Sequence, residues 1–172
     1  MFETDNDLCF NDNNPCYGGL MKVAVISDTH GLLRPEVLDK IKDAELILHG
    51  GDINRMDIID ALKKTAPLIV VRGNNDKEWA ESIPLYESFS LGSVRVYMTH
   101  KKKDLPEDLS PYDLIITGHT HKFEHKTDGE LVFLNPGSCG PRKPSQPITM
   151  AILHVEGDSF SVEKIEIPHP DA

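Results

Sequence analysis

Short apolar runs alternate with amphipathic segments in the first half of the chain. Runs at 23–26, 46–48 and 68–71 have the length and the continuous apolar character of strands in a sheet that is buried on both faces. Between them, apolar positions recur with helical spacing over residues 35–44 and 56–64. This order of strand, helix, strand, helix, strand predicts two consecutive βαβ units and therefore a parallel sheet.

A different pattern begins in the second half of the chain. Apolar and polar residues alternate over 94–98, and another short buried run occupies 114–117. Asp128-Gly129 is a turn signal between two strand-like segments, and a second turn signal lies between two longer strand-like segments within 148–167. This half is predicted to consist mainly of β-hairpins, with one short helical stretch near Asp104–Leu109.

Residues 1–20 contrast with the rest because they are rich in Asn and Asp and show neither a helical nor a strand period. We predict a poorly ordered N-terminal extension over 1–20 and a single domain over 21–172, since the length suits one domain and no linker or repeat interrupts it. No apolar run approaches the roughly 20 residues that are needed to cross a bilayer, so we expect no membrane partner.

The net charge is −10, from 28 acidic and 18 basic residues. Such a surface would repel a long nucleic acid, whereas bound cations could reverse the potential locally for a small phosphorylated substrate. Cys9, Cys16 and Cys139 show no paired metal spacing and are expected to be reduced thiols in a cytoplasmic protein, although two could pair outside the cell. The oligomeric state is left open, with a homo-oligomer among the options.

Polar residues of a restricted kind follow five of the predicted strands. Ligands bind at the carboxyl ends of strands in parallel α/β sheets, so these side chains are expected to meet at one edge. Taken singly, each could be a helix cap, a turn residue or a structural histidine, and His49, His125, His154 and His169 are assigned to that structural class. The joint pattern instead favours a metal site. Its members are Asp28, His30, Asp52, Asn74, His100, His119 and His121.

These residue types suit two divalent transition-metal ions. The Asp52 carboxylate can bridge two cations, the Asn74 amide oxygen is a neutral ligand, and imidazole favours Mn, Fe, Ni, Zn or Co over Ca or Mg, with Mn the expected metal. His119 and His121 are two residues apart, so in extended chain they face opposite sides and could reach different ions. Two ions roughly 3.5–4 Å apart can activate a bridging water and bind a phosphoryl group.

The ordered motif set resembles that of the calcineurin-like metallophosphoesterases, and Asn135-Pro136-Gly137-Ser138 resembles their compact bacterial and archaeal phosphodiesterase branch. The resemblance covers residues 22 to about 167 and implies a four-layer α/β/β/α sandwich with a dinuclear site at one sheet edge. It further implies one metal held by Asp28, His30, Asp52 and His121, and a second held by Asp52, Asn74, His100 and His119. The matching motifs are Asp28-x-His30, Gly51-Asp52, Gly73-Asn74-x-Asp76, His100 and Gly118-His119-x-His121.

Two positions depart from the family pattern. Asn75 stands where the family often has His or Cys, and a neutral amide cannot protonate a leaving alkoxide as an imidazolium can. Asn75 is still assigned a catalytic role together with Asp76, which would orient the loop that carries it. Lys101 replaces the usual Gly after the metal-binding His; it could bind an anionic substrate or belong to a solvated charge run, and Arg142 could reach a phosphate or be a plain loop cation.

The sequence therefore predicts a metal-dependent phosphodiesterase or phosphatase that acts on a small phosphate ester through a metal-bridging hydroxide. One alternative is a protein-interaction scaffold, since a member of this fold serves that role in the eukaryotic retromer coat. That reading predicts gaps in the ligand set, and all seven positions are filled. The other alternative is a nuclease, which would need a basic groove or stacking aromatic residues, and only 6% of residues are aromatic.

Overall fold

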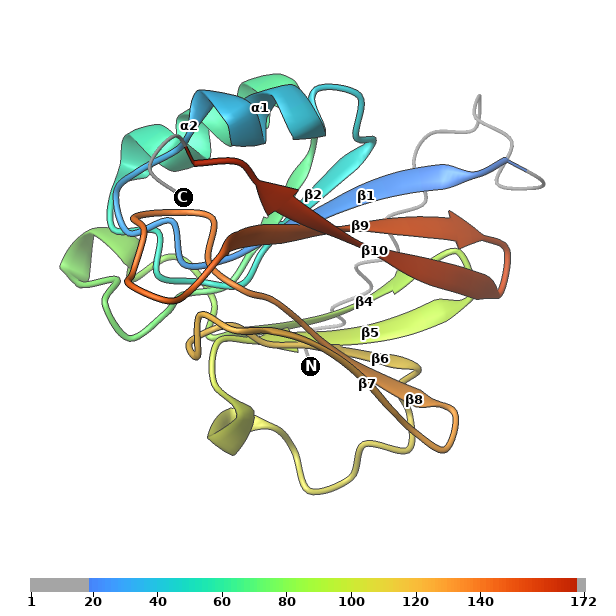
Figure 1. The fold of residues 1–172 in the computed structure, drawn as a ribbon. Coiled ribbons are helices and arrows are strands. Elements are labelled where there is room, and N and C mark those ends of the chain that lie inside the picture. The colour runs from blue at the N-terminus through green and yellow to red at the C-terminus, as the bar shows by residue number, and fades with distance from the viewer. Residues whose placement is uncertain (1–18, 170–172) are drawn as a thin grey trace.

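The computed structural model describes residues 19–169, and most of the predicted N-terminal extension, with Cys9 and Cys16, lies outside them. Two five-stranded sheets pack face to face, and two α-helices cover the outer face of one of them (Figure 1). No helix within these residues is long and apolar enough to cross a membrane.

The first sheet has the order β10-β9-β1-β2-β3. Its parallel part, β1-β2-β3, is the predicted double βαβ unit, with α1 and α2 as the crossovers. β9 joins β1 in antiparallel register, and β10 pairs with β9 along its whole length as the predicted second hairpin. The elements are β1 (Met21–Ile26), α1 (Pro35–Ile41), β2 (Leu46–His49), α2 (Met56–Thr65), β3 (Leu68–Val70), β9 (Ile148–Glu156) and β10 (Ser159–Ile167).

The second sheet has the order β4-β5-β6-β8-β7. The hairpins β4-β5 and β7-β8 form its two edges, and β6 lies between them in parallel register with both β5 and β8. The parallel pairing matters for the site, because it places the carboxyl ends of β5 and β6 side by side. The strands are β4 (Tyr86–Leu91), β5 (Val94–Thr99), β6 (Leu114–Ile116), β7 (Phe123–Asp128) and β8 (Leu131–Pro136).

Alternation of side chains along the strands divides the interior into two cores. In β1, Ala24 and Ile26 face the helices, whereas Val23 and Val25 face the second sheet, and all four are fully buried. The core between the sheets also takes Val96 and other residues from the second sheet. Burial on both faces explains why β1 is a continuous apolar run, whereas β5 alternates.

The expected α/β/β/α arrangement is confirmed, although its fourth layer is slight. Over the outer face of the second sheet, the described chain has a loop with one 3₁₀ turn, η2 (Lys102–Asp104), in place of longer helices (Figure 1). The helix predicted near Asp104–Leu109 is therefore wrong in place and length. Pro106 explains this, because proline disfavours helical backbone in the preceding residue, and Leu105 is extended at φ −69° and ψ 146°.

Candidate metal centre

Ligand-type side chains from both sheets meet at one edge of the molecule. Asp28 and His30 follow β1, and Asp52 follows β2 in the first sheet. His100 follows β5, and the loop after β6 carries His119 and His121. Two groups result, Asp28 with His30 and His121, and Asp52 with His100 and His119, and the ligand atoms in each group lie within 4.8 Å of one another. Each group takes residues from both sheets.

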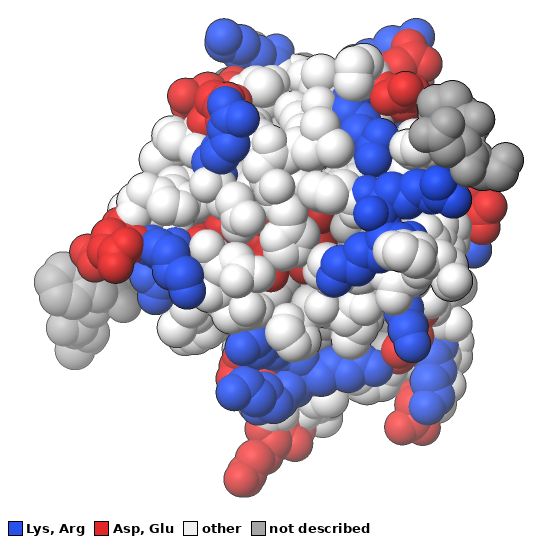
Figure 2. Space-filling view, turned by 60° about the vertical axis from the view of Figure 1, so that its left-hand side comes forward, with Lys and Arg blue, Asp and Glu red and all other residues white. Residues whose placement is uncertain are grey.

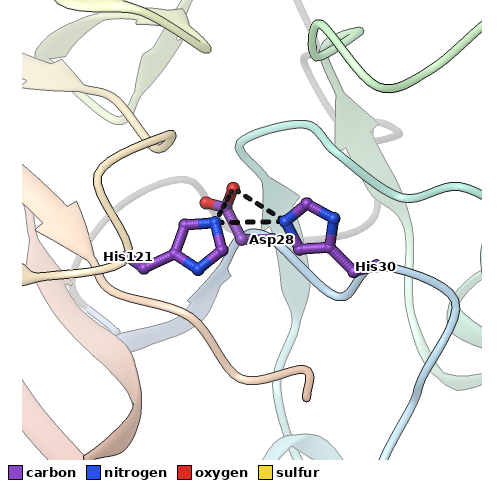
Figure 3. A group of neighbouring side chains, drawn as sticks. All are labelled: Asp28, His30 and His121. Carbon is purple, nitrogen blue, oxygen red and sulfur yellow. Dashed lines mark hydrogen bonds and ion pairs between the residues drawn. The ribbon is translucent and has the colours of Figure 1, made fainter. Parts of the chain in front are cut away.

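The first group is centred on one oxygen of Asp28. Its Oδ1 lies 3.2 Å from Nε2 of His121 and 3.5 Å from Nε2 of His30 (Figure 3). The two Nε2 atoms are 3.1 Å apart and point toward the same space. The other oxygen, Oδ2, accepts hydrogen bonds from the Ser27 hydroxyl at 2.6 Å and the His119 amide at 3.1 Å. The carboxylate is thus fixed in place with Oδ1 toward the histidines.

The second group is linked to the first through Asp52. Its Oδ2 lies 3.3 Å from Nε2 of His100 and 3.7 Å from Nε2 of His30, so one carboxylate oxygen stands between the two groups. His100 donates from Nδ1 to the carbonyl of Gly50 at 2.7 Å, which leaves Nε2 of the neutral ring without a proton. This orientation is the one that metal-binding histidines use.

Three buried polar atoms at this edge lack hydrogen-bond partners within the described residues: Oδ1 of Asp28, Nε2 of His100 and Nδ1 of His121. Buried polar groups are normally satisfied, so orphaned atoms need an explanation. The first two face the shared space between the groups, where a cation would satisfy both an anionic oxygen and a bare imidazole nitrogen. The donor set of carboxylates and imidazoles therefore fits divalent transition metals.

Five of the seven candidate ligands hold left-handed backbone. Their φ angles are 56° at Asp28, 44° at His30, 57° at Asp52, 72° at His119 and 63° at His121. This region is uncommon for residues other than glycine and is found mainly where surrounding contacts enforce it, often at functional sites. Here the left-handed backbone is enforced by hydrogen bonds between neighbouring loops.

Backbone hydrogen bonds join the β1 and β2 loops beyond the ends of the strands. The Asp28 amide donates to Gly51, the His30 amide to Asp52 and the Gly31 amide to Ile53, at 2.9–3.0 Å. The loops pass so close that a Cβ added at Gly73 would overlap the Asp52 carboxylate, and one added at Gly118 would overlap the Ser27 hydroxyl. Glycine is therefore required at both positions.

Asp76 is buried and accepts four backbone hydrogen bonds. Oδ2 accepts from the amides of Asp52 and Gly73 at 2.9 and 2.8 Å, and Oδ1 accepts from Ile53 and Asn54 at 2.9 and 2.8 Å. The carboxylate thus ties the loop after β3 to the loop after β2. The sequence predicted that Asp76 orients the loop that carries Asn75. In the structure Asp76 also accepts a hydrogen bond from the backbone amide of Asp52.

Asn74 and Asn75 are exposed and line the same cleft as the candidate ligands. Asn75 donates to Asp52 twice, from its amide to Oδ1 at 2.8 Å and from Nδ2 to Oδ2 at 3.0 Å. In this arrangement Asn75 orients the carboxylate that lies between the two groups.

The cleft has a volume of about 390 Å³, and its wall includes Pro141 and Lys143. These residues flank Arg142, which is exposed and is not among the described residues that line the cleft. Lys101 lies just after β5, beside the site, where burial, helped by the positive charge of Lys101, lowers the pKa of His119. The sequence pattern carried no signal for Lys143, because it lies in a long loop without regular spacing.

Two further buried side chains position the ligand loops. His49 accepts from the Gly51 amide at Nδ1 (3.1 Å), so Nε2 carries the proton and donates to the Thr29 hydroxyl (3.0 Å). Asn135 donates to the Gly118 carbonyl at 2.8 Å and to the Thr120 hydroxyl at 3.1 Å, and it accepts from the Gly137 amide at 2.9 Å. Its position in the Asn-Pro-Gly-Ser motif was the only sequence signal for this role.

The electrostatics of the site favour charged carboxylates and a neutral His49. Burial raises the pKa of Asp28, but the close contacts of its carboxylate with His121 and His30 and the hydrogen bond from Ser27 outweigh it and hold that pKa well below its ordinary value. Burial likewise raises the pKa of Asp52, and the contacts with His100 and the Asn75 amide lower it further than burial raises it. Burial lowers the pKa of His49 to about 4, so this ring is uncharged at neutral pH.

The fold and the site together define a class of protein. Residues 21–158 match the calcineurin-like phosphoesterase superfamily domain. A probable metallophosphoesterase of Methanothermobacter thermautotrophicus is 34% identical over 164 residues, which cover 87% of this chain and 95% of that protein. The chain therefore belongs to the calcineurin-like phosphoesterase superfamily.

Solved structures of the same fold include a phosphodiesterase and Vps29 proteins. A structure described as a novel archaeal phosphodiesterase aligns with a TM-score of 0.72 and 25% identity, over 86% of this chain and 100% of that one. Vps29 of Entamoeba histolytica, in complex with Zn²⁺, aligns with a TM-score of 0.67 and 26% identity, over 85% and 99% of the two chains.

Proposed function

We propose that this protein is a metal-dependent phosphodiesterase that hydrolyses small phosphate esters. The observation that carries the proposal is the pair of ligand groups that share the Asp52 carboxylate, with buried atoms of Asp28 and His100 left unsatisfied at their centre. Family membership supports the same reaction class.

In this proposal Asp28, His30, Asp52 and His121 hold one divalent ion, and Asp52, Asn74, His100 and His119 hold the other. When bound, the two ions supply a bridging hydroxide as nucleophile and polarise the phosphoryl oxygens. Imidazole and carboxylate ligands together accept several first-row ions, and manganese is the one proposed here. Ser27 and Asn75 orient the carboxylates, and Gly50 orients His100 through its carbonyl.

The second candidate function is a non-catalytic scaffold, and the similarity to Vps29 favours it. A Vps29 relative is in complex with Zn²⁺, so metal binding alone does not separate the two functions. The intact ligand set and the open cleft above it favour catalysis. Hydrolysis of a phosphate ester by the protein would distinguish the enzyme from the scaffold.

The test is hydrolysis of bis(p-nitrophenyl) phosphate, p-nitrophenyl phosphate and single-stranded DNA by chelated protein to which Mn²⁺ is returned. We expect the diester to be the best substrate, and Asp52→Asn to remove both activity and most of the bound metal, measured by plasma mass spectrometry. Asp60→Asn, the same change on the exposed face of α2, is the control. Full activity of Asp52→Asn with normal metal content would refute the proposed site, and metal binding without any turnover would favour the scaffold.

A further inference from the structure

Lys143 is a cation on the wall of the metal cleft. It lies in the loop between β8 and β9, with an exposed side chain that makes no hydrogen bond or ion pair with the described residues. The base of this loop is anchored to the β1 loop, because Ser138 Oγ donates to the Asp28 carbonyl at 2.9 Å and the Cys139 amide donates to the Ser27 carbonyl at 3.3 Å. The loop therefore holds Lys143 beside the candidate ligands.

Other lysines approach the cleft from different loops. Lys77 Nζ donates to the Asn74 carbonyl at 3.2 Å, and it forms no ion pair with a carboxylate among the described residues. Lys101 lies on the side of His119. Figure 2 looks onto this face: red carboxylate atoms are visible in the central hollow, and blue groups surround them on several sides. Lys143, Lys77 and Lys101 thus place positive charge around the cleft, on a chain whose net charge is −10.

The rim cations exceed what a simple diester requires. Two divalent ions would be balanced by the carboxylates of Asp28 and Asp52, a hydroxide nucleophile and the single negative charge of a diester. Asp76 adds one more negative charge, but it is buried, is not among the residues that line the cleft, and accepts from backbone amides at both oxygens. Positive charge beyond that balance attracts further anionic groups of a ligand.

We propose that Lys143 binds a second phosphate group of the substrate, so that the enzyme prefers small diesters that carry an additional phosphate beside the scissile one. This inference rests on the proposed phosphodiesterase function and names its substrate class. Lysine suits the task, since its ammonium group binds phosphate as a mobile point charge without a fixed geometry.

Two chromogenic substrates isolate the second phosphate. Thymidine 5′-(p-nitrophenyl phosphate) and its 3′-phosphorylated form share the scissile diester and the leaving group, and they differ only in the 3′-phosphate. With the Mn²⁺-loaded full chain at low salt, we expect about a tenfold lower KM for the 3′-phosphorylated form, and a loss of this advantage as ionic strength rises.

Variants then assign the preference to Lys143. Lys143→Gln should raise KM for the 3′-phosphorylated substrate about tenfold and leave the other substrate nearly unchanged, whereas Lys143→Arg should retain most of the preference. Lys64→Gln is the matched control. This exposed lysine lies at the C-terminal end of α2, near the start of β3, whereas the metal cleft lies beyond the carboxyl ends of the strands.

Calorimetric binding of thymidine 3′,5′-bisphosphate and thymidine 5′-monophosphate to the same proteins decides the inference without turnover. A bisphosphate preference that Lys143→Gln removes would support the inference even in a protein that hydrolyses neither diester, an outcome that would refute only the proposed function. Equal binding of the two nucleotides, or an equal effect of Lys143→Gln on both, would overturn the inference. Affinity for oligonucleotides that keeps rising with their length would also overturn it, in favour of nucleic acid.

Discussion

Asp52 contacts both candidate metal groups through one carboxylate, and Asn75 is the residue that orients it. The two hydrogen bonds from Asn75 fix the plane of the carboxylate, with Oδ2 between His30 and His100. Asn75 also lines the cleft, so in the proposed reaction it would lie near the leaving group. An amide can donate a hydrogen bond there but cannot transfer a proton.

Asn75 should therefore limit the range of leaving groups. We expect slow hydrolysis of alkyl diesters, whose alkoxide needs a proton, and faster hydrolysis of p-nitrophenyl diesters, whose leaving group does not. Asn75→His should raise kcat for an alkyl diester on the order of tenfold or more, with little gain on the aryl diester. The measurement is the ratio of alkyl to aryl rates, with Asn75→Ala for comparison. An unchanged ratio in both variants would contradict this role.

At the scale of elements, the site depends on hydrogen bonds between the loops that follow neighbouring strands. Asp76 shows this most directly, since one buried carboxylate accepts amides from the loops that follow β2 and β3. In Asp76→Asn, an NH₂ group would face two of these amides and leave them unsatisfied.

We expect Asp76→Asn to lower the free energy of unfolding by about 2–4 kcal/mol and to weaken Mn²⁺ binding, because the Asp52 backbone loses its support. Urea unfolding of the metal-free protein gives the first value, and metal titration gives the second. Asp60→Asn should change neither. A loss of less than about 0.5 kcal/mol, typical of a surface substitution, would show that the loops are held by other contacts.

His49 gives the same loops a dependence on pH. Burial lowers its pKa to about 4 from the ordinary 6.5, so the unfolded chain binds a proton between these values that the folded chain does not. This contribution to stability is complete above pH 6.5 and is lost as the pH falls toward 4, and it amounts to on the order of 3 kcal/mol.

The test of this pH dependence is denaturant unfolding of the metal-free protein from pH 7 to pH 4. We expect the free energy of unfolding to fall over this range, and the fall to be shallower in His49→Gln, which has no ionisable group at this position. The variant should be less stable at pH 7, but the comparison concerns the slope. Equal slopes in the two proteins would assign the acid sensitivity to other groups.

The helices α1 and α2, the parallel strands and the meeting of six carboxylate and histidine side chains at one edge could be predicted from the sequence, because buried runs end where polar motifs begin. β4 was not predicted, since an edge strand with only Phe89 and Leu91 buried has a weak apolar pattern. The place of Lys143 in the cleft could not be predicted, because it depends on contacts between its loop and the distant β1 loop. Left-handed backbone at the ligands is likewise enforced by long-range hydrogen bonds rather than by local sequence.

In the whole molecule, each candidate metal would join the two sheets. Asp28 and Asp52 belong to the first sheet, whereas His100, His119 and His121 belong to the second. Metal binding in this arrangement requires that the sheets be packed together, so it stabilises the folded state as a whole.

Returning Mn²⁺ to chelated protein at about 100 times its Kd should stabilise the fold by about 3 kcal/mol, which for a chain of this size raises Tm by roughly 5–10 °C. Thermal unfolding followed by circular dichroism measures the change. Asp52→Asn should lose most of the increase, and Asp60→Asn should keep it. A Tm that does not respond to Mn²⁺ in the parent protein would contradict a metal site shared by the two sheets.

The carboxylates of Asp28 and Asp52, which lie below the lysines of the cleft, also determine the order in which metal and substrate bind. Without its cations, the hollow presents the negative charges of Asp28 and Asp52 to any incoming phosphate and repels it. Once the cations are in place, the same hollow attracts phosphate. The protein should thus acquire its metals before it meets its substrate, and metal-starved protein should be a poor receptor for the molecules that the loaded enzyme prefers.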